Sequence, residues 1–368
     1  MPLWLSVSHE NLKAVNEMTI YLIGLGLGTS RQLTLEALET AKSLDKIYLD
    51  TYTSFIENSF LEELSKELGE RLVKADRRML EEKVSDIIRE AGRMEVGILI
   101  PGDPLIATTH TSIIAEAAKK GISFKVIHGL SIYCAALSAS YLHAYKFGRV
   151  TTIPKSGIGV ETCYRVIAEN MERGLHTLVL LDTADGGLTI PEAIELLLRA
   201  EDKFGLGIIH GDRLVICLAR IGFDDEFKWA GRLRDASQRK YPPPPHSIIF
   251  PGELHFSERE ALKAILNADA EVLDEHKPPR LWSSRIEKYL ENVRRALEEM
   301  SYLSNDITED LVNIARSYLE DAERFWESGD LFDALAAVSY AEGLLDALRI
   351  MGKVEFTWGS GERVINGR

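Results

Sequence analysis

The sequence IPGDPLIATTH, residues Ile100–His110, completes the apolar run Val96–Ile100 and leads into a segment of helical pattern. The apolar run predicts a buried strand. The Pro-Gly-Asp-Pro after it predicts a sharp turn, because Gly102 can adopt backbone angles that other residues resist and the prolines stiffen the chain. In open α/β sheets, ligands bind just beyond the carboxyl ends of strands. The turn is therefore a candidate ligand site, and a plain strand-to-helix connection without a ligand is the alternative that this stretch alone leaves open.

Strand and helix patterns alternate around this turn. They predict strands at 19–25, 46–49, 96–100 and 124–127, and helices at 34–43, 60–68, 81–93 and 111–120. Repeated strand–helix units predict a mostly parallel sheet covered by helices.

A second set of α/β elements follows near residue 129. It comprises predicted strands at 177–181, 214–219, 228–231 and 247–250, and predicted helices at 131–139, 160–172 and 191–200. The four prolines Pro242–Pro245 exclude helix and central strand, so they predict a stiff extended loop. The fold class is therefore α/β, with two successive α/β domains.

The last part of the chain is almost entirely helix-forming. Helices are predicted at 285–300, 307–327 and 331–351, with Ser328-Gly329-Asp330 as a helix stop and a new N-cap. Apolar residues recur there at steps of three and four, as a packed helix requires. We predict a separate small α-helical bundle, joined through a Lys277-Pro278-Pro279 linker.

The composition is that of an acidic globular protein. The chain has 368 residues, a formal net charge of −14 and three cysteines, Cys134, Cys163 and Cys217. The negative charge argues against nucleic acid as the main partner. Widely spaced cysteines in apolar surroundings predict buried free thiols and a reducing, cytoplasmic location. No apolar run reaches the roughly 20 residues that cross a bilayer, and residues 1–17 lack the pattern of a secretory signal, so no membrane partner is expected.

The glycine-rich segment Gly24–Gly28 invites a dinucleotide-binding interpretation. That fingerprint has glycines at its first, third and sixth positions, and Thr29 occupies the sixth here. Nicotinamide or flavin binding is therefore disfavoured, although Asp50 lies roughly where a ribose-binding acid would. The chain has no P-loop, His-Glu-x-x-His or Gly-x-Ser-x-Gly motif, and its histidines show no metal-ligand spacing, so no metal site is predicted.

Several blocks of sequence together resemble the diphthine synthases. In chain order they are MTIYLIGLGL at 18–27, PGDPLIATTH at 101–110, HGLSIY at 128–133, YKFG at 145–148, ERGLHTL at 172–178 and PPH at 244–246. Diphthine synthases belong to the class III, tetrapyrrole-methylase-like methyltransferases. The resemblance implies two α/β domains of that type, at 18–128 and 129–268, with S-adenosyl-L-methionine bound in the cleft between them. Residues 1–17 would then be a flexible extension.

The same resemblance implies which residues hold the cofactor, whose product is S-adenosyl-L-homocysteine. They lie at the first glycine turn, at the Gly-Asp-Pro turn and the helix after it, at the domain junction, near the ends of two later strands, and after the proline run: Leu27, Asp103, Ile106, Ser131, Ile132, Leu181, Ile221 and His246. Most are apolar, which suits a ligand held through backbone groups and shape. For Leu27, Ile132 and Leu181, core packing is the alternative that their sequence alone favours.

For the reaction, the resemblance implies methylation of the amino group of a 3-amino-3-carboxypropyl-histidine on translation elongation factor 2. The product in archaea is a trimethylammonium group, and the enzyme is usually a homodimer. A free α-amino group has a pKa near ~8, and desolvation lowers it, so a strong base is not obviously required and no catalytic residue is assigned. His110 and His128 are candidates to assist proton removal, with a structural role as the alternative.

The helical region at 280–352 departs from ordinary diphthine synthases. Around Ala341–Asp346 it resembles a small archaeal helical family of unassigned function, which indicates an archaeal source and a domain fusion. Two other functions stay open. One is a class III methyltransferase acting on a corrin or porphyrin precursor, although those enzymes usually carry a Gly-Pro-Gly-Asp-Pro-like first turn where this chain has Gly24–Gly28. The other is a non-catalytic, translation-associated binding module, against which the intact Gly-Asp-Pro turn argues.

Overall fold

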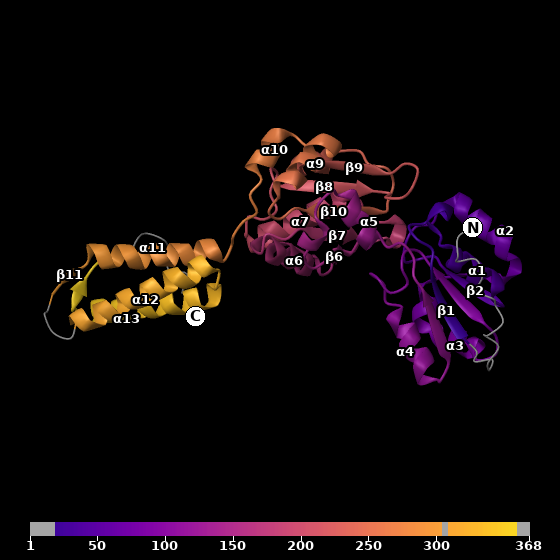
Figure 1. The fold of residues 1–368 in the computed structure, drawn as a ribbon, viewed down its shortest axis with the longest axis horizontal. Coiled ribbons are helices and arrows are strands. Elements are labelled where there is room, and N and C mark those ends of the chain that lie inside the picture. The colour runs from indigo at the N-terminus through magenta and orange to yellow at the C-terminus, as the bar shows by residue number, and fades with distance from the viewer. Residues whose placement is uncertain (1–18, 304–307, 359–368) are drawn as a thin grey trace, which may run out of the picture. The chain divides into compact units, whose positions relative to one another are not determined.

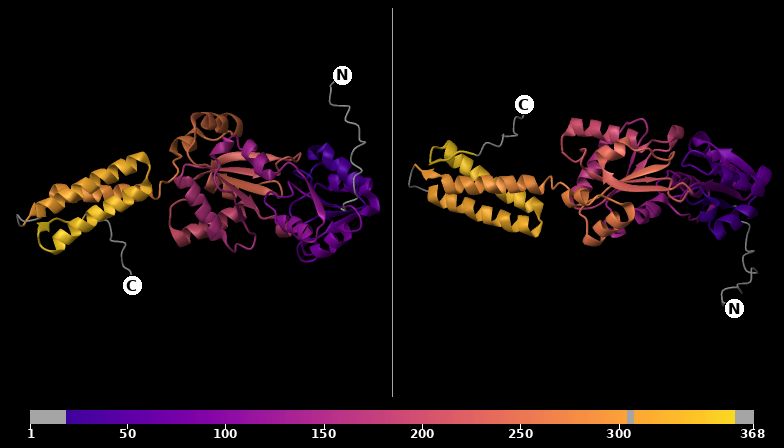
Figure 2. Two further views of the ribbon diagram at one scale, coloured as in Figure 1. Left: turned by 60° about the horizontal axis from the view of Figure 1, so that its bottom comes forward. Right: turned by 90° about the horizontal axis from the view of Figure 1, so that it is seen from above.

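The computed structural model describes residues 19–303 and 308–358, so the extension predicted at 1–17 lies outside the described residues. The chain forms two compact units, the first ending at Pro278 and the second beginning at Pro279. Figures 1 and 2 show the elements of each unit.

The first half of the first unit is a wholly parallel sheet of order β3-β2-β4-β1-β5. Apolar side chains cover both of its faces, as expected of a buried parallel sheet. One cluster lies between the sheet and helices α3 and α4, and the other between the sheet and helices α1 and α2. The elements are β1 (Thr19–Gly24), α1 (Leu35–Ser43), β2 (Lys46–Asp50), α2 (Asn58–Leu68), β3 (Leu72–Ala75), α3 (Val84–Ala91), β4 (Val96–Ile100), α4 (Thr111–Lys119) and β5 (Ser123–Ile127).

The second half carries a mixed sheet of order β6-β7-β10-β8-β9, in which only β6 and β7 are parallel. Strand β10 runs antiparallel between β7 and β8, so its first residue, His246, pairs with the last residue of β8, Ala219. The elements are α5 (Ile132–Ala139), β6 (Thr151–Ile153), α6 (Val160–Glu172), β7 (Thr177–Leu181), α7 (Ile190–Phe204), β8 (Leu214–Ala219), β9 (Phe227–Arg232), α8 (Leu233–Gln238), β10 (His246–Phe250), α9 (Phe256–Leu266) and α10 (Ala270–Glu275).

The structure confirms the α/β class and most predicted elements, with local corrections. Strands β3 and β6 were not predicted, and both are short edge strands. The helix predicted at 81–93 starts only at Val84, because an irregular helical turn, Arg78–Glu82, precedes it. The prediction of three buried thiols is wrong for Cys134, which is exposed, whereas Cys163 and Cys217 are buried.

Helix α10 lies beyond residue 268, where the second α/β domain was predicted to end. Its Val272 and Leu273 are buried in the same apolar cluster as strands β7 and β8. Arg213 Nη1 donates to the Lys277 carbonyl at 3.0 Å, which fixes the segment after α10 as well. The first compact unit therefore continues to Pro278.

The second unit is a bundle of three helices, α11 (Ser283–Glu299), α12 (Thr308–Ser328) and α13 (Leu331–Ile350), with the short strands β11 (Ser301–Tyr302) and β12 (Val354–Glu355). Gly329 has φ +83° after α12, and the Asp330 side chain accepts from the Asp333 N–H at the start of α13, so the predicted stop and N-cap are confirmed. A single apolar cluster joins the three helices. Among the described residues, no helix combines the length and apolar character that crossing a bilayer requires.

Candidate active site

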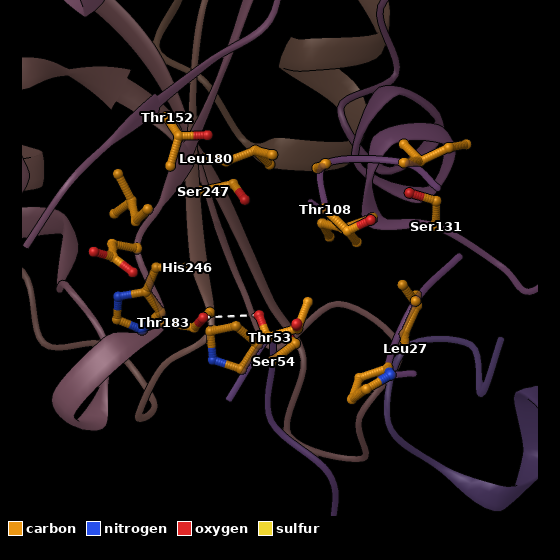
Figure 3. Close-up of a pocket in the computed structure, with 18 of the residues that line it drawn as sticks. Leu27, Thr53, Ser54, Thr108, Ser131, Thr152, Leu180, Thr183, His246 and Ser247 are labelled. Atoms are coloured by element: carbon orange, nitrogen blue, oxygen red, sulfur yellow. Dashed lines mark hydrogen bonds between the residues drawn. The ribbon is translucent and has the colours of Figure 1, made fainter. Parts of the chain in front are cut away.

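A pocket lies where the edges of the two sheets in the first unit meet. Its volume is about 280 Å³, near the lower end of the range for small-molecule sites. The first sheet contributes residues that follow β1, β2 and β4, and the second contributes residues at the carboxyl ends of β7 and β8 and the amino end of β10. The antiparallel course of β10 is what brings His246 to this edge. Figure 3 shows Leu27 and Thr53 from the first half facing Leu180 and Ser247 from the second.

Glycines bring three strand ends together beneath this pocket. A Cβ on Gly24 would lie 2.5 Å from Gly129 N, and one on Gly129 would lie 2.4 Å from the Gly102 carbonyl oxygen. No side chain fits in either place. The Gly102 N–H in turn donates to the Gly26 carbonyl at 2.6 Å, which ties the glycine-rich turn to the Gly-Asp-Pro turn. The backbone itself thus forms this part of the pocket, as the sequence around residue 102 predicted.

Seven of the eight predicted cofactor-binding residues line the pocket. They are Leu27, Ile106, Ser131, Ile132, Leu181, Ile221 and His246. Ile106 lies in the loop between the Gly-Asp-Pro turn and α4, which starts at Thr111 as predicted. The next residue, Ala107, has φ +57°, a left-handed conformation that is costly for a residue with a Cβ and often found near functional sites.

Asp103, the eighth predicted residue, is buried behind the pocket instead of lining it. Its Oδ1 accepts from the Leu105 N–H at 2.9 Å, and its Oδ2 lies 2.8 Å from His128 Nδ1. Asp103 therefore fixes the shape of the turn that carries Gly102 and Ile106. Its side chain is a positioning group for the pocket wall.

His246 has both ring nitrogens engaged by the backbone. Nδ1 accepts from the Ile190 N–H at 3.2 Å, and Nε2 lies 2.7 Å from the Pro242 carbonyl oxygen and so carries the proton. Burial lowers the pKa of His246, which keeps the ring neutral. With both nitrogens engaged, His246 shapes the pocket and is not a proton acceptor.

Polar residues that were not predicted from the sequence also line the pocket. They include Tyr52, Thr53, Glu81, Thr108, Asp182 and Thr183. The Thr183 hydroxyl donates to the Thr53 carbonyl at 2.8 Å and so joins the two halves of the unit (Figure 3). Tyr52, Thr53, Asp182 and Thr183 directly follow β2 or β7, so the rule that ligands bind at the carboxyl ends of strands is the signal that could have found them.

The charged side chains at the pocket have partners within the protein. Arg77 Nε donates to Glu81 Oε2 at 2.9 Å, and Asp182 accepts from the N–H groups of Lys155 and Ala184, both at 3.0 Å. The Arg220 guanidinium lies 4.1 Å from the centre of the Phe223 ring and pairs with Asp225. Among residues 19–303 and 308–358, no group of three His, Cys, Asp or Glu side chains could hold a metal ion.

The two histidines considered for proton removal differ in position. The His128 side chain is 72% exposed, pairs with Asp103 and does not line the pocket. His110 is buried, and its Nε2 lies 3.5 Å from the hydroxyl of Tyr52, which does line the pocket. The structure therefore brings only His110 into contact with a pocket residue.

Residues 19–237 match the family model described as tetrapyrrole (corrin/porphyrin) methylases. The chain therefore belongs to the tetrapyrrole methylase family, a class of methyltransferases. Among curated relatives, it is 42% identical over 254 residues to a diphthine synthase of Staphylothermus marinus, covering 66% of this chain and 92% of that protein. It is 40% identical over 253 residues to a diphthine synthase of Sulfurisphaera tokodaii, covering 67% and 99%.

A crystal structure of a diphthine synthase superposes with a TM-score of 0.64 at 31% identity, covering 70% of this chain and 99% of that one. Within the methylases the chain thus belongs to the diphthine synthase family, and it is a methyltransferase. The family resemblance inferred from the sequence blocks is confirmed. Residues 286–354 match a second family model, described as a protein of unknown function, DUF357, which agrees with the helical family of unassigned function inferred for this region.

Proposed function

We propose that this protein methylates the amino group of a 3-amino-3-carboxypropyl-histidine on translation elongation factor 2, up to three times, with S-adenosyl-L-methionine as the methyl donor. Membership of the diphthine synthase family supports the choice of reaction. The observation that carries it is a pocket lined by glycine backbone, apolar side chains and polar side chains, formed at the meeting edges of two sheets. Such a mixed lining suits a nucleoside cofactor together with an amino-acid-like group.

The glycine turn at residue 102 and the apolar residues that line the pocket fit the cofactor. Gly102 lines the pocket with φ +85°, and a Cβ built on it would have no atom within 4 Å, so any side chain there would fill the open space. The seven predicted residues that line the pocket would surround the cofactor, and Asp103 would hold the turn behind it. When bound, the cofactor supplies a methyl group on a positively charged sulfur, which a neutral amine can displace.

The polar side chains of the pocket suit the amine that receives the methyl group. Glu81 and Asp182 place two carboxylates near a head group that gains methyl groups and stays cationic. Transfer out of water into the pocket lowers the pKa of an amine, whereas the two carboxylates favour its charged form, so the two effects oppose each other. Orientation of the amine towards the methyl group lowers the activation barrier further, by up to roughly 7–11 kcal/mol in well-aligned systems.

The test uses elongation factor 2 with and without the aminocarboxypropyl group, incubated with methyl-labelled cofactor. We expect label on the modified factor alone, with up to three methyl groups by intact-protein mass spectrometry. Equal labelling of both factors would overturn the substrate, and labelling of a corrin or porphyrin precursor would favour the other methylase activity. A cytoplasmic homodimer is part of this proposal, and sedimentation of the purified chain at twice its monomer mass is the expected result.

A further inference from the structure

A chain of polar side chains leads from the pocket into the interior of the first half. Tyr52 lines the pocket, and its hydroxyl lies 3.5 Å from His110 Nε2. The same Nε2 lies 3.4 Å from Asp50 Oδ2. His110 is 2% exposed and Asp50 is 0% exposed, and neither of them lines the pocket itself.

Both buried groups keep an atom with spare hydrogen-bonding capacity. Asp50 Oδ1 accepts from the N–H groups of Tyr52 and Thr53, at 2.9 and 3.0 Å, whereas Asp50 Oδ2 has no hydrogen-bond partner among the described residues. His110 Nδ1 likewise makes no hydrogen bond of normal geometry, although the Pro104 carbonyl lies near the ring. Buried polar atoms in folded proteins nearly always have partners, and unpaired ones need an explanation.

Amine methylation makes a demand that this arrangement can meet. Conversion of R–NH3⁺ to R–N(CH3)3⁺ forms three N–C bonds, breaks three S–CH3 bonds and releases three protons. One proton must leave the nitrogen before each transfer, because an ammonium group has no lone pair. Within the pocket lining, the neutral His246 already uses both nitrogens.

We propose that Tyr52 is a catalytic residue that takes a proton from the substrate amine as it passes its own proton to His110 Nε2, and that Asp50 stabilises the imidazolium that forms. This proposal rests on the proposed function. The amine N–H bond breaks and a bond to the Tyr52 oxygen forms, while the Tyr52 O–H bond breaks and a bond to His110 Nε2 forms. The proton returns through Tyr52 to Glu81 Oε1, which lies 3.4 Å from the hydroxyl at the partly exposed mouth of the pocket.

The surroundings of Tyr52 and His110 suit the transient transfer of a proton, because neither residue keeps the proton that it receives. Burial, with Asp50 and Glu81 nearby, raises the pKa of Tyr52 to about 12, so the residue relays a proton as a neutral hydroxyl. Burial lowers the pKa of His110, whereas Asp50, the Pro104 carbonyl and Glu81 all favour its protonated form. The ring is thus neutral before the transfer and stabilised after it. Distances of 3.4–3.5 Å between such groups often shorten once a substrate is bound.

The test is the pH dependence of methyl transfer by Tyr52→Phe, followed in single turnovers with the modified factor and saturating cofactor. Removing the hydroxyl should slow transfer by about tenfold at neutral pH, because only about a tenth of an amine of pKa near ~8 is neutral there without help. The rate should recover near pH ~9.5, where solvent deprotonates an amine of pKa near ~8. Tyr48→Phe is the matched control, because Tyr48 lies on β2, the strand that Tyr52 follows, donates to Glu90 at 2.7 Å and lies outside the pocket.

His110→Gln completes the experiment, since it removes the proton acceptor and leaves Tyr52 in place. We expect the same loss at neutral pH, the same recovery in alkali and unchanged cofactor affinity by calorimetry. Tyr52→Phe within twofold of the unmodified enzyme at neutral pH would overturn the relay, as would an equal loss at both pH values, which indicates a structural role. Failure of the unmodified enzyme to methylate the factor would instead overturn the proposed function.

Discussion

Two fully buried carboxylates, Asp50 in the first half and Glu258 in the second, have opposite surroundings. Glu258 accepts from Lys146 Nζ at 2.5 Å, from the backbone N–H groups of His143 and His255 at 2.7 Å, and from His176 Nε2 at 3.0 Å. Asp50 has one partnered oxygen and one that faces only His110. The difference indicates that Glu258 stabilises the fold, whereas Asp50 has an unused hydrogen-bond acceptor close to the pocket.

The largest expected effect is on the free energy of unfolding. Replacing the carboxylate by an amide in Glu258 and in Asp50 should give very different losses. Glu258→Gln places an amide NH2 among groups that donate hydrogen bonds and leaves the Lys146 ammonium without its carboxylate. Breaking a buried pair in this way should lower the free energy of unfolding by about 3 kcal/mol. Asp50→Asn keeps the oxygen that accepts from Tyr52 and Thr53, so its loss should stay within about 1 kcal/mol. Urea denaturation measures both, and equal losses would contradict the comparison.

A smaller loss of stability is expected on acidification. Burial alone would raise the pKa of Glu258, but Lys146 and the backbone N–H groups lower it from 4.5 to about 2. Burial lowers the pKa of His176 from 6.5 to about 4. In both cases the unfolded chain binds more protons than the folded one, so stability falls as the pH drops.

The His176 contribution should disappear between pH 6.5 and about 4, and the Glu258 contribution between pH 4.5 and about 2. Denaturation at a series of pH values measures the slope. Glu258→Gln should remove the part of the decline below pH 4.5, so an unchanged slope in that variant would exclude Glu258 as its source.

Asp103 is a third buried carboxylate, and it supports the Gly102 turn of the pocket from behind. Asp103→Ala leaves the Leu105 N–H without its acceptor and frees the turn that carries Gly102. Cofactor affinity measured by calorimetry should fall by about tenfold, which corresponds to roughly 1.4 kcal/mol. Asp45→Ala is the control, since Asp45 also accepts from a backbone N–H, that of Glu95 at 3.0 Å, and does not line the pocket. Equal cofactor affinities of the two variants would show that Asp103 does not support cofactor binding.

The contrast between the carboxylates also shows what the sequence can and cannot predict. Strands such as β7 and β8 are predicted to the residue, because buried apolar runs bounded by polar residues have sharp ends. Strand direction is not encoded in such runs, so the mixed second sheet was not foreseen. The short strands β3 and β6 carry too few apolar residues to be distinguished from loops.

Site residues divide in the same way. The turn at Gly102 was predicted because the motif Pro-Gly-Asp-Pro is typical of a sharp turn. Asp103 was placed correctly in the turn, but the sequence could not show that its side chain is used by its own backbone and by His128. Tyr52 and Glu81 belong to no motif and come together only when the strands pack side by side.

The smallest effect is expected from removing the helical unit. It has its own apolar cluster and forms a separate compact unit from Pro279 onward. Truncation after Pro278 should therefore give a folded methyltransferase whose cofactor affinity and methyl transfer stay within about twofold, a change of less than roughly 0.5 kcal/mol. Loss of activity in this variant would mean that the helical unit takes part in methyl transfer.

A second truncation, after Ala268, should have a much larger effect on stability than the truncation after Pro278. It removes α10, so Val272 and Leu273 no longer fill the cluster of the second half, and each such side chain contributes about 1.5–3 kcal/mol when fully buried. It also removes Glu271 and Glu275, which pair with Arg232, and the Lys277 carbonyl that accepts from Arg213. We expect this shorter chain to melt well below the longer one. Equal melting temperatures would show that α10 adds nothing to the first unit, and the boundary would then lie at residue 268.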